Sequence, residues 1–175
     1  MWPLFLYNSV VMKKSSLFKD ILSVLIPVVL VFVFIKFIVF PSSVDGRSMN
    51  PNLQDGDIGF SFVITKEIKV NRFDIAVIDI GEKLLVKRVI GLPNDKVEYI
   101  DNRLFINDKY YDEPFLGDVH TDDLSIELKE DEYFCLGDNR DISLDSRYYG
   151  TFKFENLVAT HFLTIYPFEN FGFDY

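Results

Sequence analysis

Three short segments hold the residue types that nucleophilic and acid–base chemistry requires, and the first is the loop Gly46–Asp57. In this loop Ser48 lies between Gly46 and Pro51, which favour a turn that presents a hydroxyl and free backbone N–H groups. A serine hydroxyl is a weak nucleophile until an adjacent base accepts its proton. Serine is also an ordinary turn residue, so this segment alone is consistent with a turn that has no chemical role.

The second segment, Lys83–Asp95, supplies a candidate base. In a strand, side-chain alternation places Lys87 on one face and Arg88 on the other, and both faces are otherwise apolar. A lysine among aliphatic side chains loses its preference for the charged form, so its pKa falls and the neutral amine can act as a general base. A lysine that faces solvent on an edge strand remains the alternative.

The third segment, Gly137–Gly150, is dense in hydrogen-bonding groups. Its fourteen residues include three Asp, two Ser, two Arg and one Asn. Such groups can be buried only if they satisfy one another, so the segment is either a polar network or a solvated surface loop. A calcium loop is disfavoured because the regular acidic spacing and the terminal Glu of an EF-hand are missing.

The composition excludes several classes of function. The formal net charge of -9 argues against a nucleic-acid partner, which needs a basic surface. A single cysteine, Cys135, allows no intrachain disulfide and no thiolate metal cluster. The two histidines, His120 and His161, lie outside the three segments, and we interpret both as structural. No metal or organic cofactor is suggested.

The elements that position these segments begin with one apolar run, residues 21–40, whose only charge is Lys36. A helix of this length spans ~30 Å, the thickness of a bilayer core. The run is longer than the ~7–15 apolar residues of a cleaved signal peptide, and no small-x-small cleavage site follows it. We therefore expect an uncleaved, single-pass transmembrane anchor over residues 21–40.

The distribution of charge predicts the orientation of this anchor. Lys13, Lys14 and Lys19 precede the run and favour a cytoplasmic segment over residues 1–20. Residues 41–175, with 14 Lys and Arg against 26 Asp and Glu, then form an extracytoplasmic domain at the cell membrane. The sequence leaves open whether Met1–Val11 is a genuine extension.

The domain after the run is expected to be mainly β. A two-residue turn, Asp101-Asn102, tolerates positive φ and predicts a hairpin, and Asn107-Asp108 predicts a second turn. An acidic surface loop with one short strand is expected over residues 118–132. The segments rich in β-branched and aromatic residues are Asp57–Ile64, Phe73–Ile80, Lys96–Ile100 and Arg103–Ile106. The predicted architecture is one transmembrane helix followed by a β-barrel or coiled-sheet domain.

Taken together and in this order, the three segments resemble the conserved boxes of bacterial type I signal peptidase (leader peptidase) in its short, single-anchor form. The resemblance covers roughly residues 41–167 and the anchor. It is carried by Ser48-Met49-x-Pro51, Lys87-Arg88-Val89-Ile90-Gly91-Leu92-Pro93, and Gly137-Asp138-Asn139-Arg140 with Ser143, Asp145-Ser146-Arg147 and Gly150. It implies a mainly-β protease domain that uses a Ser-Lys dyad to cleave signal peptides from exported preproteins with small residues at the cleavage site.

The resemblance also implies a role for individual residues. Ser48 is similar to the nucleophile, with its backbone N–H as an oxyanion donor, and Lys87 is similar to the general base. Ser143 is similar to the hydroxyl that orients the lysine. Four charged residues are similar to those that brace the site by charge-assisted pairs: Asp138, Arg140, Asp145 and Arg147.

Three positions depart from the resemblance. Gly46 stands where some relatives have a serine whose hydroxyl assists the oxyanion hole, so its backbone must suffice or the hole has a weaker donor. Asn52 and Asn94 stand where many relatives have Thr and Gly. The short connection between residues 95 and 136 also implies that a large accessory subdomain is absent.

Two other functions are compatible with parts of the sequence. A self-cleaving repressor-type protease uses a similar dyad, but it would need a cytosolic or DNA-binding partner domain where this chain has an apolar run. An anchored binding or assembly module that has lost activity is disfavoured because Ser48 and Lys87 are both present. The preferred preproteins, the oligomeric state and the residues of the specificity pockets are not predicted.

Overall fold

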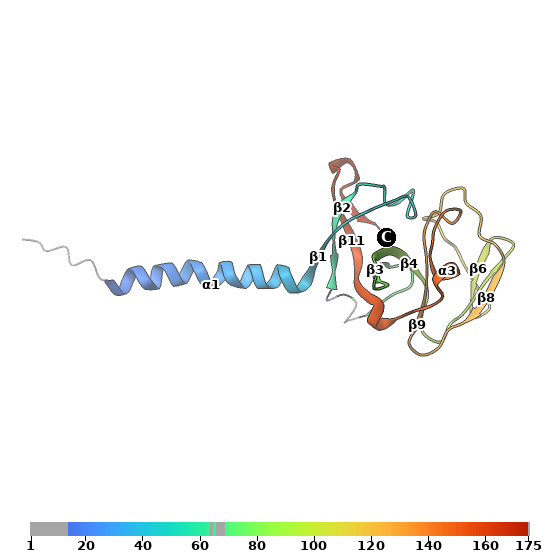
Figure 1. Ribbon diagram of the computed structural model, residues 1–175, viewed down its shortest axis with the longest axis horizontal. Coiled ribbons are helices and arrows are strands. Elements are labelled where there is room, and N and C mark those ends of the chain that lie inside the picture. Colours follow the sequence, from blue (N-terminus) through green and yellow to red (C-terminus); the bar gives the residue numbers. More distant parts are fainter. Residues whose placement is uncertain (1–13, 64, 66–68, 175) are drawn as a thin grey trace, which may run out of the picture. The chain divides into compact units, whose positions relative to one another are not determined.

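The structure is a computed structural model that describes residues 14–63, 65 and 69–174. The expected cytoplasmic segment, apart from residues 14–20, lies outside the described residues, as does Ile64 at the end of a predicted strand. The chain divides into two compact units, Met1–Lys36 and Phe37–Tyr175 (Figure 1).

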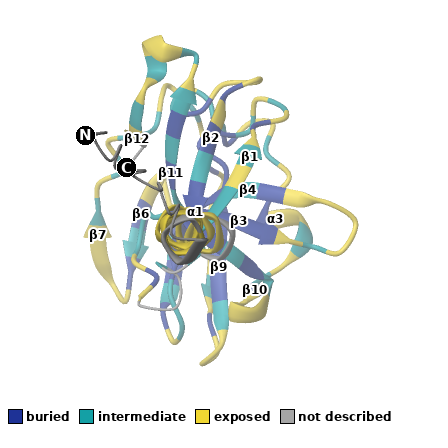
Figure 2. Cartoon of the chain, turned by 90° about the vertical axis from the view of Figure 1, so that its left-hand side faces the viewer, coloured by how far each residue is buried: buried dark blue, intermediate teal, exposed yellow. Residues whose placement is uncertain are grey.

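The first unit is dominated by the helix α1, Lys14–Ile38, which has Pro27 in its interior. Its window Phe18–Ile35 is long and apolar enough to cross a membrane, and none of that window is buried (Figure 2). The helix ends two residues before the predicted end, because Val39 and Phe40 belong to the strand β1. Pro41 follows them, and a residue before proline is disfavoured in the helical region.

The second unit contains an open antiparallel sheet in the order β1-β2-β11-β3-β4-β9-β10, with β12 beside β11. The strand β4 carries both Lys87 and Arg88 and pairs with β3 and β9. The strand bounds are β1 (Val39–Ser43), β2 (Ile58–Phe62), β3 (Ile75–Asp79), β4 (Leu84–Gly91), β9 (Glu132–Leu136), β10 (Phe152–Lys153), β11 (Leu157–Tyr166) and β12 (Gly172–Asp174).

A smaller sheet has the order β7-β6-β5-β8 and confirms the predicted hairpin. Asp101 and Asn102 in the first turn, and Asn107 and Asp108 in the second, all have positive φ. Its strands are β5 (Lys96–Ile100), β6 (Arg103–Ile106), β7 (Lys109–Tyr111) and β8 (Leu124–Glu127), and the short helices are α3 (Ser146–Tyr149), η1 (Phe154–Asn156) and η2 (Phe168–Asn170). Neither sheet closes over the described residues, so the domain is a coiled-sheet structure and the barrel form of the prediction is not adopted.

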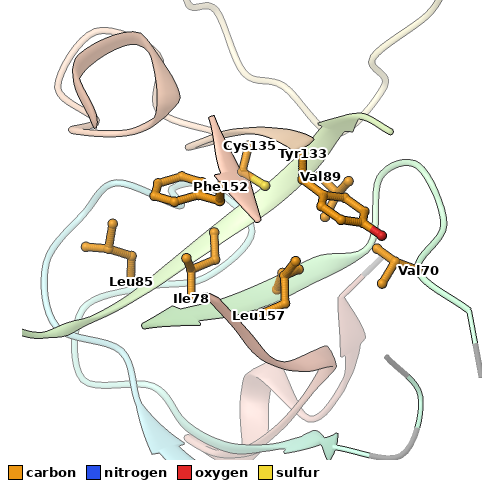
Figure 3. Packing of buried hydrophobic residues seen from close by; sticks show 9 residues of the cluster. Val70, Ile78, Leu85, Val89, Tyr133, Cys135, Phe152 and Leu157 are labelled. Carbon is orange, nitrogen blue, oxygen red and sulfur yellow. The ribbon is translucent and has the colours of Figure 1, made fainter. Parts of the chain in front are cut away.

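Apolar clusters cover both faces of β4. One cluster packs Leu85 and Val89 of β4 with residues of β3, β9 and β11 (Figure 3). A second cluster packs Ile90 with β9 and the smaller sheet. Because successive side chains of a strand point to opposite faces, Lys87 lies on the first side and Arg88 on the second. In Figure 2 the strands β3, β4 and β9 are largely buried, in contrast to α1.

Candidate active site

The turn that carries Ser48 is fastened to the core on both sides of the serine. The backbone N–H of Gly46, which has φ +94°, donates to the Asp55 carboxylate at 2.9 Å. The N–H of Leu53 donates to the Met49 carbonyl at 3.0 Å, and both side chains are fully buried. The loop is therefore anchored by apolar side chains while Ser48 itself is only half-buried.

The amine of Lys87 meets the hydroxyl of Ser48. Lys87 Nζ donates to Ser48 Oγ at 2.6 Å, across 39 residues of sequence. The Lys87 side chain is only 3% exposed, and this burial lowers its pKa from 10.5 to about 8, although the negative charges of Asp145 and Asp138 oppose the shift. Among the described residues no carboxylate oxygen lies within ion-pair distance of Nζ. The arrangement can hold a neutral amine against a hydroxyl near neutral pH.

The backbone around Ser48 has one open donor. Among residues 14–63, 65 and 69–174, no acceptor takes the N–H of Ser48, whereas its carbonyl accepts from Asn139 N–H at 3.0 Å. Because the N–H of Gly46 is engaged by Asp55, it is not free to stabilise an oxyanion. An oxyanion that forms next to Ser48 Oγ would therefore meet the N–H of Ser48 first.

Asp138 pairs with the arginine beside Lys87. Its two oxygens accept from Arg88 Nε at 2.8 Å and Nη2 at 2.7 Å, and both side chains have no exposed surface. Arg88 also donates to the Phe73 carbonyl at 2.9 Å, and its guanidinium lies 4.1 Å from the centre of the Phe115 ring. This bidentate pair joins β4 to the Gly137–Gly150 segment.

Arg140 has a different set of partners. It pairs with Glu113 at 2.6 Å and donates to Tyr99 Oη, Thr121 Oγ1 and the Gly137 carbonyl. Burial raises the pKa of Tyr99 well above its ordinary value, so the phenol stays protonated and donates to Glu113. Arg140 thus ties the third segment to the smaller sheet.

Asp145 and Arg147 form a local pair at the start of α3. Arg147 donates from Nε and Nη2 to the Asp145 carboxylate at 2.9 and 2.8 Å. The carboxylate also caps α3 and accepts the N–H of Gly137 at 3.0 Å. Burial would raise the pKa of Asp145, but the bonds from Arg147 and Gly137 outweigh it and hold the pKa below its ordinary value.

Ser143 does not contact Lys87 in the way that the resemblance implies. Its Oγ is buried and has no hydrogen-bond partner among the described residues, although it lies close enough to Asp145 to help lower that carboxyl's pKa. A side chain at Gly137 would collide with Ser143 Oγ and with the Ser48 carbonyl. Gly137 therefore allows this segment to pack closely against the serine loop.

Ser48 and Lys87 lie in a cleft of about 450 Å³. Two stretches form its walls: residues 40–49, which include most of β1, and residues 83–87 at the start of β4. The strand β1 is at the edge of its sheet, and residues Leu84–Lys87 pair with β3 alone in the described structure. The cleft therefore has backbone free to pair along both walls, and the exposed side chains of Ile142 and Leu144 extend its apolar lining.

Several residues at the site were not assigned a role from the sequence. The sequence marks Arg88 only as the neighbour of Lys87. It marks Asn52 only as a position that departs from the resemblance. Glu113 and Tyr99 had no local signal, because their partner Arg140 is 27 and 41 residues away. His120 and His161 do not reach the cleft, and their carboxylate neighbours are Asp122 and Asp74.

Comparison with known proteins identifies close similarities along most of the chain. Residues 17–166 match the family described as "Signal peptidase, peptidase S26". Signal peptidase IB of Staphylococcus aureus (strain MRSA252) is 31% identical over 93% of this chain and 96% of its own length. Signal peptidase I of Bacillus licheniformis is 35% identical over 90% of this chain and 92% of its own length.

A solved structure supports the fold. The crystal structure of a signal peptidase I from Enterococcus faecalis V583 is similar with a TM-score of 0.50 and 34% sequence identity. The similarity covers 53% of this chain and 96% of that chain. The mainly-β coiled-sheet domain is thus shared with a solved relative.

Proposed function

The chain belongs to the signal peptidase S26 family of serine endopeptidases, and from this premise we propose that Ser48 and Lys87 are a catalytic dyad that removes signal peptides from exported preproteins. The observation that carries the proposal is the 2.6 Å contact between Lys87 Nζ and Ser48 Oγ at a buried amine of lowered pKa. A neutral amine at this distance meets the geometric requirement for a general base.

In this mechanism the neutral Lys87 accepts the proton of Ser48 Oγ as the oxygen attacks the scissile carbonyl. The N–H of Ser48 stabilises the negative oxygen that develops. The protonated Lys87 then gives its proton to the leaving amine, which departs as the new N-terminus of the mature protein. Lys87 next activates a water molecule that hydrolyses the acyl-enzyme and restores Ser48.

The cleft suits an extended peptide as substrate. A peptide strand laid between β1 and the start of β4 can pair with free backbone on both walls. Val44 and Val86 are apolar and line this cleft, so shallow pockets for small side chains such as alanine are expected there. This supports substrates with small residues at the cleavage site.

We assign residues 21–40, which include most of α1, as a single-pass anchor, with residues 1–20 in the cytoplasm and residues 41–175 outside. Its apolar window is unburied, which a lipid environment explains. Ser48 follows the last helical residue, Ile38, by ten residues, so the chain holds it within about 35 Å of the helix end. A preprotein whose cleavage site follows its own membrane segment would then be concentrated near Ser48.

The test is cleavage of a preprotein with an Ala-x-Ala site by the full-length protein in detergent. Wild-type protein should cleave it, and Ser48→Ala should abolish cleavage. Ser125→Ala, which removes a serine hydroxyl in the smaller sheet, should leave the rate unchanged. A serine-directed acylating inhibitor should form a covalent adduct at Ser48. Cleavage by Ser48→Ala at the wild-type rate would exclude the dyad, and an inactive wild-type protein would favour the binding-module alternative.

A further inference from the structure

One buried carboxylate is bonded to both of the segments that carry the dyad. The Asp138 side chain accepts two bonds from Arg88, the residue after Lys87. It also accepts a bond of 2.8 Å from Asn52 Nδ2, four residues after Ser48. The serine loop and the lysine strand, which are far apart in the sequence, therefore meet at one carboxylate.

The Asn52 amide uses both of its N–H groups. Besides Asp138, it donates to the Phe115 carbonyl at 2.7 Å, and Phe115 in turn stacks on the Arg88 guanidinium at 4.1 Å. Because both acceptors contact Nδ2, they fix which way the amide points: its oxygen in that place would be repelled by both. The Asn52 side chain thus connects the serine loop to two other segments: Gly137–Gly150 and the loop before β8.

The placement of these segments decides the distance between the reacting groups. A hydrogen bond weakens steeply beyond about 3.2 Å, and a displacement of about 1 Å can reduce an enzymatic rate about 100-fold. Two hydrogen bonds join the Gly137–Gly150 segment directly to the serine loop in the described structure. One is a backbone bond, from the N–H of Asn139 to the Ser48 carbonyl at 3.0 Å. The other is the side-chain bond from Asn52 to Asp138.

We propose that Asn52 is a positioning residue, which holds the Ser48 loop against Asp138 and so keeps Ser48 Oγ in contact with the Lys87 amine. The proposal rests on the proposed function, because it assumes that the Ser48–Lys87 contact is catalytic. In the described structure the Asn52 side chain is hydrogen-bonded to neither of those side chains, and it acts through Asp138. Threonine, which the resemblance places at this position, offers one donor where Asn52 offers two.

The experiment compares three substitutions in the full-length protein in detergent, with kcat, KM and the pH profile measured on a preprotein substrate. Asn52→Leu keeps the branching and the number of side-chain heavy atoms and removes both donors, and we expect kcat to fall about 10- to 100-fold with KM within about twofold. Asn52→Asp places a second carboxylate against Asp138 and should lower kcat further. Asn52→Thr retains one donor and should be intermediate.

The pH profile separates positioning from simple loss of stability. A loosened serine loop admits water to Lys87, so the kinetic pKa of Asn52→Leu should rise from about 8 towards the ordinary lysine value of 10.5. Asn107→Leu is the matched control, because Asn107 also donates to a carboxylate, that of Asp95 at 2.8 Å, but in the smaller sheet. It should lower the melting temperature at least as much and leave kcat per folded protein and the pH profile unchanged.

Two outcomes would overturn the proposal. One is a folded Asn52→Leu or Asn52→Thr protein with the wild-type kcat and pH profile. The other is a loss of kcat that follows melting temperature equally in the Asn52 and Asn107 variants. If Asn52→Leu does not fold, Asn52→Thr alone decides between these results. Failure of the proposed function is distinguishable, because it appears as undiminished cleavage by Ser48→Ala.

Discussion

Lys87 and Arg88 are adjacent basic residues on β4, and both are almost completely buried. They differ in that Arg88 has a carboxylate partner and Lys87 has none among the described residues. Arg88 forms a bidentate pair with Asp138 and a bond to the Phe73 carbonyl. Lys87 donates to the Ser48 hydroxyl and has no ion pair among the described residues. Burial lowers the pKa of Lys87 to about 8, whereas Arg88 has a bidentate carboxylate partner.

The comparison shows that the partner, more than burial, decides what a buried cation does. Side-chain alternation sends the two residues to opposite faces of one strand, so only Arg88 is bonded to Asp138, whose charge acts on Lys87 without an ion pair. A paired arginine stabilises the fold, and arginine does not act as a base in proteins because it is not deprotonated there. An unpaired lysine is costly to bury, and that cost makes its amine a usable base near neutral pH.

The largest difference should appear when Lys87 is replaced by methionine, which is apolar and of similar length. Without its base, Ser48 is a poor nucleophile, so Lys87→Met should lower kcat/KM by roughly 10³- to 10⁶-fold in the preprotein cleavage assay. The free energy of unfolding of Lys87→Met in urea at pH 7 should equal or exceed that of the wild type, because this variant has no amine to bury. Retained cleavage would remove the lysine from the mechanism.

The same substitution at Arg88 should have its main effect on stability. Arg88→Met leaves the Asp138 carboxylate buried without its cation, which costs about 3–5 kcal/mol. The free energy of unfolding from urea titration measures this loss. Arg103→Met, at an exposed position in the smaller sheet, is the control and should stay within about 0.5 kcal/mol. Equal stability of Arg88→Met and wild type would contradict a structural role for the pair.

The pH dependence of cleavage tests the unpaired amine directly. Lys87 is the base only when neutral, and its lowered pKa of about 8 means that protonation removes the base as the pH falls below that value. We expect kcat/KM to be level above pH 8 and to fall about tenfold per unit below it, which is about 100-fold by pH 6. A profile that is flat between pH 6 and 8 would be incompatible with Lys87 as the base.

The smallest effect is expected at Ser143. Its hydroxyl lies beside Asp145 without a bond to Lys87 in this structure, so any effect on the amine would pass through Asp145. Because no hydrogen bond among the described residues is lost with this hydroxyl, Ser143→Ala should lower kcat by less than about tenfold. A loss as large as that of Ser48→Ala would mean that this hydroxyl takes part in the reaction itself. An unchanged kcat would mean that the hydroxyl has no part in catalysis.

The sequence alone determined the features that depend on local pattern. The long apolar run of α1, the hairpin with Asp101 and Asn102 at its turn, and the identity of Ser48 and Lys87 as candidates all follow from neighbouring residues. The resemblance implied only that Asp145 and Arg147 take part in charge-assisted pairs. The structure shows that they pair with each other, two residues apart, and that Asp145 caps a short helix.

Only the tertiary structure decided which distant groups meet. Asp138 pairs with Arg88 across 50 residues, Arg140 pairs with Glu113, and Asn52 joins Asp138 across 86 residues. The open, coiled form of the sheet was likewise undecided between two predicted forms. The physical reason is that hydrogen bonds and ion pairs depend on distances of about 3 Å, which strand periodicity and residue type do not specify until the sheets have packed.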